Sequence, residues 1–249
     1  MTKRSAAATL AVCAFGLLLA GCVLPSDDGG LSSEPTTTTE SSADPTPSPS
    51  RTSLEGRFTY ETMDEYVDAV LPMIEDWIHD TWPRMSIPQV VYVASGASGR
   101  EGCRDSDGRY VSYSSESYEY CPGDATVYVG QDTLWEFYSK TGDAGPAMGL
   151  AHEFGHHVQT ELSLPSPQTA AESVRYEDQA DCLAGAWTQY INKRHELEYP
   201  DDIEDIELLF PIIGSAEGPD QDHGTASERE AVFNEGFTGG VTACGVRAG

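Results

Sequence analysis

Apolar side chains recur at intervals of three or four residues over most of the chain beyond residue 60. This spacing is typical of amphipathic helices, and it predicts helices at residues 62–78, 132–140, 146–162, 173–195, 203–213 and 226–237. β-Branched and aromatic residues gather at 89–94 and 125–130, which predicts two short strands. The sequence therefore predicts an α+β domain that is mainly helical and has a small β-sheet.

Two details concern the first helix and the loop between the strands. Thr62 and Glu65 have the spacing of a capping box, whereas Pro72 predicts a kink or a broken first turn. The loop at 95–124 is polar and contains several glycines and tyrosines. Its tyrosines suit either a substrate groove or an aromatic hairpin surface, and we favour the hairpin.

The N-terminal segment has the pattern of a processing signal. Lys3 and Arg4 precede an apolar run at 6–20, and Leu19-Ala20-Gly21-Cys22 closes it. Small residues before a cysteine at this position predict a lipoprotein signal peptide at 1–21, with lipid on the Cys22 sulfur. An ordinary secretory signal is the alternative, and both predict export.

A segment rich in serine, threonine and proline follows the signal. Residues 22–56 contain few large apolar side chains, so they cannot bury enough apolar surface to offset the entropy of the chain. We predict a disordered tether here and a folded domain at 57–249. The expected location is extracytoplasmic, with the protein anchored to the cell membrane through the lipid on Cys22.

The charge of the chain excludes one class of partner. The formal net charge is −27, and acidic residues cluster between 196 and 235. Because nucleic-acid binding needs a basic surface, we expect no nucleic-acid partner. The acidic cluster is predicted to be a solvated surface, and a preference for cationic substrates is a weaker alternative.

The candidate chemistry begins with a His-Glu-x-x-His motif in the helix predicted at 146–162. His152 and His156 are four residues apart, so both imidazoles project from one face of the helix. This spacing is typical of two zinc ligands, with Glu153 placed to act on a water at the ion. A catalytic zinc site needs a third protein ligand and an open position for water.

The third ligand is predicted on the next long helix. Glu177 and Asp181 are also four residues apart and share a helix face. Glu177 would bind the metal, and Asp181 would accept a hydrogen bond from a ligand histidine and fix its orientation. Two carboxylates on one face are alternatively a solvated surface, but the segment becomes apolar after Ala180, which favours the metal site.

These residues carry a resemblance to the bacterial neutral zinc metallopeptidase family. The similarity extends over roughly residues 103–236 and rests on four segments: 152–159 (His-Glu-Phe-Gly-His-His-Val-Gln), 179–185 (Gln-Ala-Asp-Cys-Leu-Ala-Gly), His223-Gly224-Thr225, and 120–128 with its Tyr-Cys-Pro-x-Asp and Val-Tyr pairs. The sequence departs from the family at 226–229, where Ala-Ser-Glu-Arg stands in place of Ser-x-Gln-Arg, and in the acidic linker at 216–222.

The resemblance implies a zincin-like peptidase that cleaves peptide bonds in a peptide or protein substrate. Zn²⁺ would activate a water, with Glu153 as the general base. His223 is the candidate for stabilising the oxyanion, and its alternative is a loop histidine with local contacts only. His157 points away from His156 on the helix and is interpreted as structural. The competing hypothesis is a catalytically idle zinc-containing lipoprotein that serves as a binding module.

The cysteines predict disulfides. Once Cys13 leaves with the signal and Cys22 takes lipid, four remain, and four cysteines allow three pairings. Outside the cytoplasm disulfides are more plausible than free thiols, and we favour Cys103–Cys121 with Cys182–Cys244. A zinc site built from these cysteines is the alternative, but they lack the paired short spacing of such sites.

Overall fold

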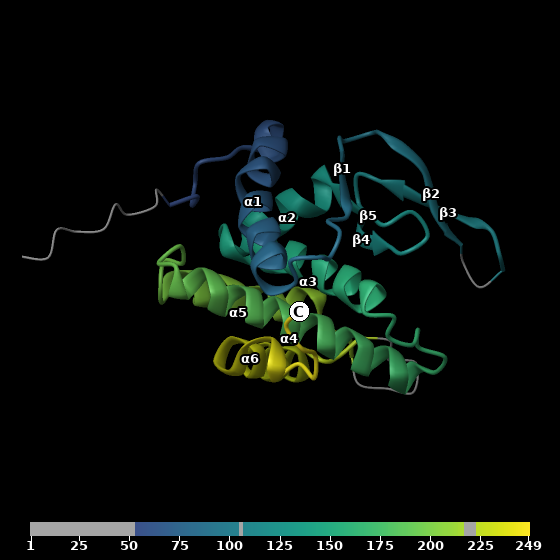
Figure 1. Ribbon diagram of the computed structural model, residues 1–249. Coiled ribbons are helices and arrows are strands. Elements are labelled where there is room, and N and C mark those ends of the chain that lie inside the picture. Colours follow the sequence, from purple (N-terminus) through teal and green to yellow (C-terminus); the bar gives the residue numbers. More distant parts are fainter. Residues whose placement is uncertain (1–52, 105–106, 217–222) are drawn as a thin grey trace, which may run out of the picture. The chain divides into compact units, whose positions relative to one another are not determined.

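The helix that carries the His-Glu-x-x-His motif, α3 (Ala144–Glu161), lies between the sheet and the C-terminal helices (Figure 1). The structure is a computed structural model, which describes residues 53–104, 107–216 and 223–249. The predicted signal peptide, Cys22 and the predicted tether up to residue 52 lie outside the described residues. Among the described helices, none is both long and apolar enough to cross a membrane.

The sheet is small and mixed. Strand β1 (Gln89–Val93) pairs in parallel with the central strand β5 (Thr126–Gly130), and β4 (Tyr118–Cys121) pairs with β5 in the antiparallel direction. Strands β2 (Ser98–Arg104) and β3 (Tyr110–Ser114) form a separate antiparallel hairpin. The hairpin prediction for the tyrosine-rich loop is confirmed, and the fold is α+β and mainly helical, as predicted.

The first long helix differs in two respects from its prediction. α1 (Met63–Thr81) follows a short 3₁₀ turn, and the capping box joins Thr59 to Thr62, so the predicted Thr62–Glu65 box is wrong. The helix also runs without a break through Pro72. Pro72 and Asp68 are both exposed, so water can satisfy the Asp68 carbonyl that loses its donor.

The remaining helices form one packed group with α3. They are α2 (Gln131–Thr141), α4 (Ala170–Lys193), α5 (Asp201–Ile213) and α6 (Ala226–Gly239), followed by a 3₁₀ turn, η2 (Gly240–Thr242). Their buried side chains join those of α1, α3 and β5 in the main hydrophobic core, and the partly buried Tyr118 and Tyr120 of β4 pack against it. Burial of this apolar surface is the main term that stabilises the arrangement.

Helices α4 and α6 approach each other at the level of the backbone. A Cβ atom on Gly185 would lie 2.0 Å from the Phe233 carbonyl oxygen, and one on Gly236 would lie 1.8 Å from the Cys182 carbonyl oxygen. Only glycine permits such contact. The close packing places α6, and with it Arg229, against the helix that carries Glu177.

The two disulfides have the favoured pairing. Cys103–Cys121 joins β2 to β4, and Cys182–Cys244 joins α4 to the C-terminal segment. The second bridge closes a loop with a sequence separation of 62 residues. It therefore fixes the end of the chain beside the candidate metal site.

Candidate metal centre

The motif helix is buried around most of its surface, and it presents both histidines to α4. The rings of His152 and His156 lie 4.7 Å apart between centroids. Gly155 lies between them, and a Cβ atom there would be only 3.2 Å from the Cα and carbonyl oxygen of Ala180. The glycine therefore lets α3 and α4 approach closely enough for ligands from both helices to meet.

Glu177 is the residue of α4 that meets the two histidines. Its Oε2 lies 3.2 Å from His152 Nε2, and its Oε1 lies 3.5 Å from His156 Nε2. One donor atom from each of the three residues lies within 4.8 Å of the other two. Two imidazole nitrogens and a carboxylate form a donor set that zinc uses in catalytic sites, so the residues present fit this ion.

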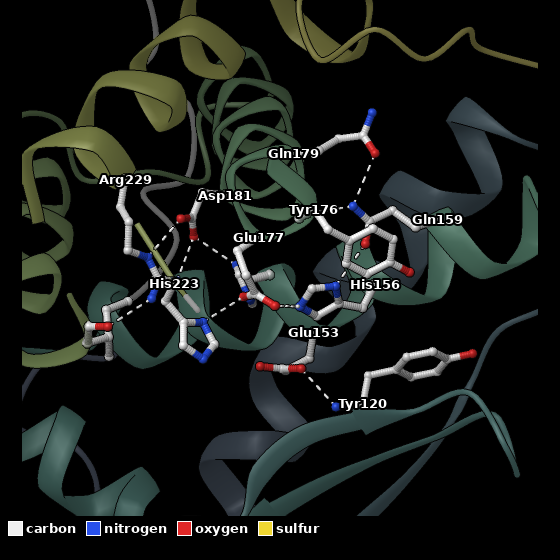
Figure 2. A network of polar contacts seen from close by, with 12 residues as sticks. Tyr120, Glu153, His156, Gln159, Tyr176, Glu177, Gln179, Asp181, His223 and Arg229 are labelled. Carbon is white, nitrogen blue, oxygen red and sulfur yellow. Dashed lines mark hydrogen bonds and ion pairs between the residues drawn. The ribbon is translucent and has the colours of Figure 1, made fainter. Parts of the chain in front are cut away.

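His152 is oriented by a buried chain of charged groups. Its Nδ1 lies 2.8 Å from Asp181 Oδ1, and Asp181 in turn receives two hydrogen bonds from Arg229, through Nε at 2.8 Å and through the second guanidinium nitrogen at 2.9 Å (Figure 2). Asp181 is completely buried and Arg229 is 4% exposed. The contact leaves His152 Nε2 directed to Glu177, which is the orientation that a ligand requires.

The electrostatics of this group favour a positive charge on the His152 imidazole. Burial alone would lower the pKa of His152, but the Asp181 carboxylate outweighs it, and the pKa is raised. Burial opposes ionisation of Glu177 and Asp181 as well. Hydrogen bonds from the histidines nevertheless lower the pKa of Glu177, and the charges of His152 and Arg229 lower that of Asp181. Two ionised carboxylates beside two imidazoles suit a cation.

His156 is oriented by amides instead. Its Nδ1 lies 2.8 Å from Gln159 Oε1, while Gln159 Nε2 donates to the Tyr176 carbonyl at 2.7 Å and to Gln179 Oε1 at 3.1 Å (Figure 2). The Gln179 amide then donates to the Cys244 carbonyl at 2.9 Å. The imidazole also stacks on the Tyr176 ring, 5.4 Å away between centroids.

Glu153 lies beside the ligands and faces the strand β4. It is 8% exposed, and its Oε2 accepts a hydrogen bond of 2.8 Å from the Tyr120 backbone N–H. Burial raises its pKa, although the charges of His152 and His156 oppose this effect. The carboxyl group is therefore tuned toward accepting a proton, as a general base requires.

A cavity of about 530 Å³ opens in front of this group. Glu153, His152, His156 and Glu177 line it together with these residues: Tyr118, Glu119, Tyr120, Phe137, Gly149, Leu209, Ile213, His223 and Arg229. Tyr118 and Tyr120 therefore belong to strand β4 and also line the cavity. The donor set therefore faces a space that can admit water and a substrate.

The two remaining histidines near the motif have different surroundings. His223 lies with its Nδ1 3.0 Å from Glu177 Oε2 and its side chain 45% exposed at the cavity. The structure therefore brings it to the site, and its role at the oxyanion stays a prediction. His157 is fully buried, with Nε2 2.8 Å from the Ser86 carbonyl and Nδ1 3.2 Å from the Tyr120 hydroxyl, which agrees with a structural residue.

Sequence reasoning assigned no role to several residues that contact the candidate ligands. Gln159 and Gln179 lie in the motifs of the resemblance, and Arg229 lies in a segment that departs from it. Gln159 is three residues after His156, which is a spacing that brings side chains together on a helix. No comparable signal connects Arg229 to Asp181, because the two lie 48 residues apart.

Comparison with known proteins identifies a family that this chain matches. The family described as "Putative neutral zinc metallopeptidase" matches residues 108–246. The chain is 35% identical over 145 residues to "Uncharacterized protein YpfJ" of Escherichia coli (strain K12), with 49% of this chain and 50% of that protein covered. It is 32% identical over 155 residues to "Uncharacterized protein Rv2575" of Mycobacterium tuberculosis (strain ATCC 25618 / H37Rv), with 50% and 53% covered.

The chain thus spans about half the length of the curated relatives it matches. No solved structure gives a significant match. The family match includes the segments that carry the candidate ligands and the candidate base, namely His152, His156, Glu177 and Glu153.

Proposed function

This chain belongs to the putative neutral zinc metallopeptidase family, and from that premise we propose that it is a zinc-dependent peptidase. The observation that supports the proposal most strongly is the convergence of His152, His156 and Glu177 within 4.8 Å beside a buried Glu153. A purely structural zinc site usually has four protein ligands and needs no base. Here three donors face a cavity, with a base next to them.

The residues have separate roles in the proposed reaction. His152, His156 and Glu177 would hold the ion, whose chemistry when bound is to polarise a carbonyl group and make water more acidic. Glu153 accepts a proton from the attacking water and then delivers it to the leaving amine. The Tyr120 N–H holds the Glu153 carboxylate toward the cavity, and Asp181 with Arg229 keeps His152 in the orientation that a ligand needs.

The substrate in this proposal is a peptide or protein in extended form. Strand β4 is at an edge of the described sheet, and Tyr118, Glu119 and Tyr120 from this strand line the cavity. Extended peptides commonly bind beside such edges, where the backbone provides hydrogen bonds and the cavity receives side chains. Apolar contact is available from Phe137, Leu209 and Ile213.

Export and anchoring are further parts of the proposal. They rest on the pattern of Lys3, Arg4, the apolar run at 6–20 and Cys22 in the sequence, and the disulfides are consistent with an oxidising compartment. Replacing Cys22 by serine is expected to release the protein from membranes or to block its maturation. Unchanged membrane fractionation of the Cys22→Ser variant would contradict lipid attachment at this residue.

Metal removal tests the function. Full-length protein should cleave members of a peptide library, lose this activity after chelation, and regain it with stoichiometric zinc. His156→Ala should lose the metal, whereas His195→Ala, at an exposed position beyond α4, serves as the matched control and should keep it. A protein that binds zinc but cleaves no peptide would favour the binding-module hypothesis. Stoichiometric zinc retained in both His156→Ala and Glu177→Ala would contradict the ligand assignment.

A further inference from the structure

A second cavity, separate from the candidate metal centre, lies at the other end of the motif helix. It has a volume of about 270 Å³ and shares no lining residue with the metal-site cavity. Ala144 and Ala147 of α3, Val70 and Met73 of α1, and Trp187 of α4 contribute to its wall. Further apolar lining comes from Leu54, Ala69, Ile191, Leu197 and Ile206. Most of the wall is therefore apolar.

Two aspartates with little solvent exposure line this apolar space. Asp143 and Asp202 both line the cavity and are 9% and 8% exposed. One oxygen of Asp202 accepts a hydrogen bond from the Glu198 N–H at 2.7 Å. Within the described residues, no other residue donates a hydrogen bond to the Asp143 carboxylate, and no basic side chain lies within ion-pair distance of either aspartate.

The two aspartates lie in an acidic environment. Burial, followed by the charges of Asp202 and Asp205, raises the pKa of Asp143 to about 7, and burial raises that of Asp202 to about 6. Glu198 and Glu196 are also in the lining, and Glu196 forms an ion pair with Arg194 at 3.1 Å. Among the described residues of the lining, Arg57 is the one basic side chain; it is exposed, and its guanidinium lies 5.5 Å from the centre of the Phe58 ring. Buried ionised groups are costly unless an opposite charge approaches them.

We propose that this cavity binds a small organic cation, with an ammonium or guanidinium group at Asp143 and Asp202 and an apolar stem against the wall. The carboxylates select the charge, and the apolar surface around Trp187 and Met73 selects the stem. The volume suits a group of about the size of one amino-acid side chain, since it lies just below the ~300 Å³ at which typical ligand sites begin. The site is independent of the peptidase reaction.

A divalent metal ion is the competing ligand. Oxygen atoms of Glu55, Asp143 and Asp205 lie within 4.8 Å of one another. Calcium takes about six to eight oxygen ligands, however, and gains nothing from an apolar wall. In addition, the Glu55 and Asp205 carboxylates already accept hydrogen bonds from the Asp143 and Ala144 N–H groups at 3.1 and 3.4 Å. The apolar wall and the position of Asp202 favour the organic cation.

Isothermal titration of the full-length protein tests the proposal. The probe is the n-hexylammonium ion at pH 8, and the comparison is n-hexanol, which has the same stem without the charge. We expect saturable binding of the ammonium, with clearly weaker binding of the alcohol. Asp143→Asn and Asp202→Asn should each weaken ammonium binding by roughly tenfold or more, the loss expected when one partner of a buried charge pair is removed.

The control is Asp205→Asn, which removes a neighbouring carboxylate that does not line the cavity. It should change the affinity far less than the other two variants, and circular dichroism should show that all three are folded. No ammonium binding, or equally tight binding of the alcohol, would overturn the proposal. Displacement of the ammonium by micromolar calcium would instead assign the cluster to a metal ion and would also overturn it.

Discussion

Replacement of Arg229 by methionine should destabilise the protein strongly, because it leaves a buried carboxylate without its counter-charge. Arg229 is 4% exposed and donates two hydrogen bonds to Asp181, which is completely buried, and a third to the Ile213 carbonyl at 3.0 Å. Methionine keeps most of the volume of the stem and removes all three. Among the described residues, His152 would then be the one remaining side-chain partner of Asp181.

The magnitude follows from the burial of the pair. Breaking a buried ion pair by removing one partner costs about 3–5 kcal/mol. For a domain of this size, each kcal/mol lowers the melting temperature by about 2–4 °C, so the variant should melt roughly 6–20 °C below the parent. Because Asp181 orients His152, zinc affinity should fall by about 10–100-fold.

The matched control is Arg194→Met. Arg194 has a side chain that is 40% exposed, and it forms ion pairs with Asp76, Asp80 and Glu196 at 3.1–3.8 Å. Exposed pairs contribute at most about 1 kcal/mol, so this variant should keep its zinc affinity and nearly all of its stability. Differential scanning calorimetry and competitive zinc titration measure both effects. Equal small losses in the two variants would refute the reasoning about the Asp181 pair.

Three other predictions concern the rest of the domain. Replacing Cys182 and Cys244 by serine should lower the free energy of unfolding by about 4 kcal/mol, because the bridge closes a long loop. Zinc binding should also weaken, since Gln179 donates a hydrogen bond to the Cys244 carbonyl. Unchanged stability in denaturant would contradict this prediction. Gly236→Ala should destabilise the protein by about 3 kcal/mol or more, because the added Cβ would lie 1.8 Å from the Cys182 carbonyl oxygen. A melting temperature equal to that of the parent would instead show that α4 and α6 can separate at little cost in free energy. Asp143→Asn should raise the melting temperature more at pH 8 than at pH 5. Burial raises the pKa of Asp143 to about 7, so the folded parent binds more protons than the unfolded chain between about pH 4 and 7 and loses stability as the pH rises through this range. Asparagine does not titrate, and an equal shift at both pH values would contradict the burial argument.

Much of the fold could be predicted from the sequence because its helices carry continuous apolar stripes. The predicted helices at 146–162 and 173–195 correspond to α3 and α4, within a few residues at each end. The prediction for the N-terminus of α1 was wrong because the side chains of Thr59 and Thr62 form a capping box three residues earlier than the predicted box of Thr62 and Glu65. A break at Pro72 does not occur, because the exposed Asp68 carbonyl can reach water, which the sequence does not encode locally.

The candidate site could be predicted only as far as local spacing extends. Side chains four residues apart on one helix can be paired directly from the sequence, and this holds for His152 with His156 and for Glu177 with Asp181. The contact of Arg229 with Asp181, and that of the Tyr120 N–H with Glu153, depend on packing between elements far apart in the chain. The cavity at Asp143 and Asp202 likewise appears only when α1, α3, α4 and α5 are assembled.

The central claim is that Glu153 handles protons at a zinc site, and Glu153→Gln tests it most directly. Glutamine keeps the shape of the side chain and can still accept the hydrogen bond from the Tyr120 N–H, while all three ligands remain. Zinc content and peptide turnover should be measured on the same sample of full-length protein. The account predicts unchanged zinc and a turnover lower by about 10²–10⁴-fold, the usual contribution of general acid–base catalysis. A variant that retains zinc and cleaves as fast as the parent would contradict it.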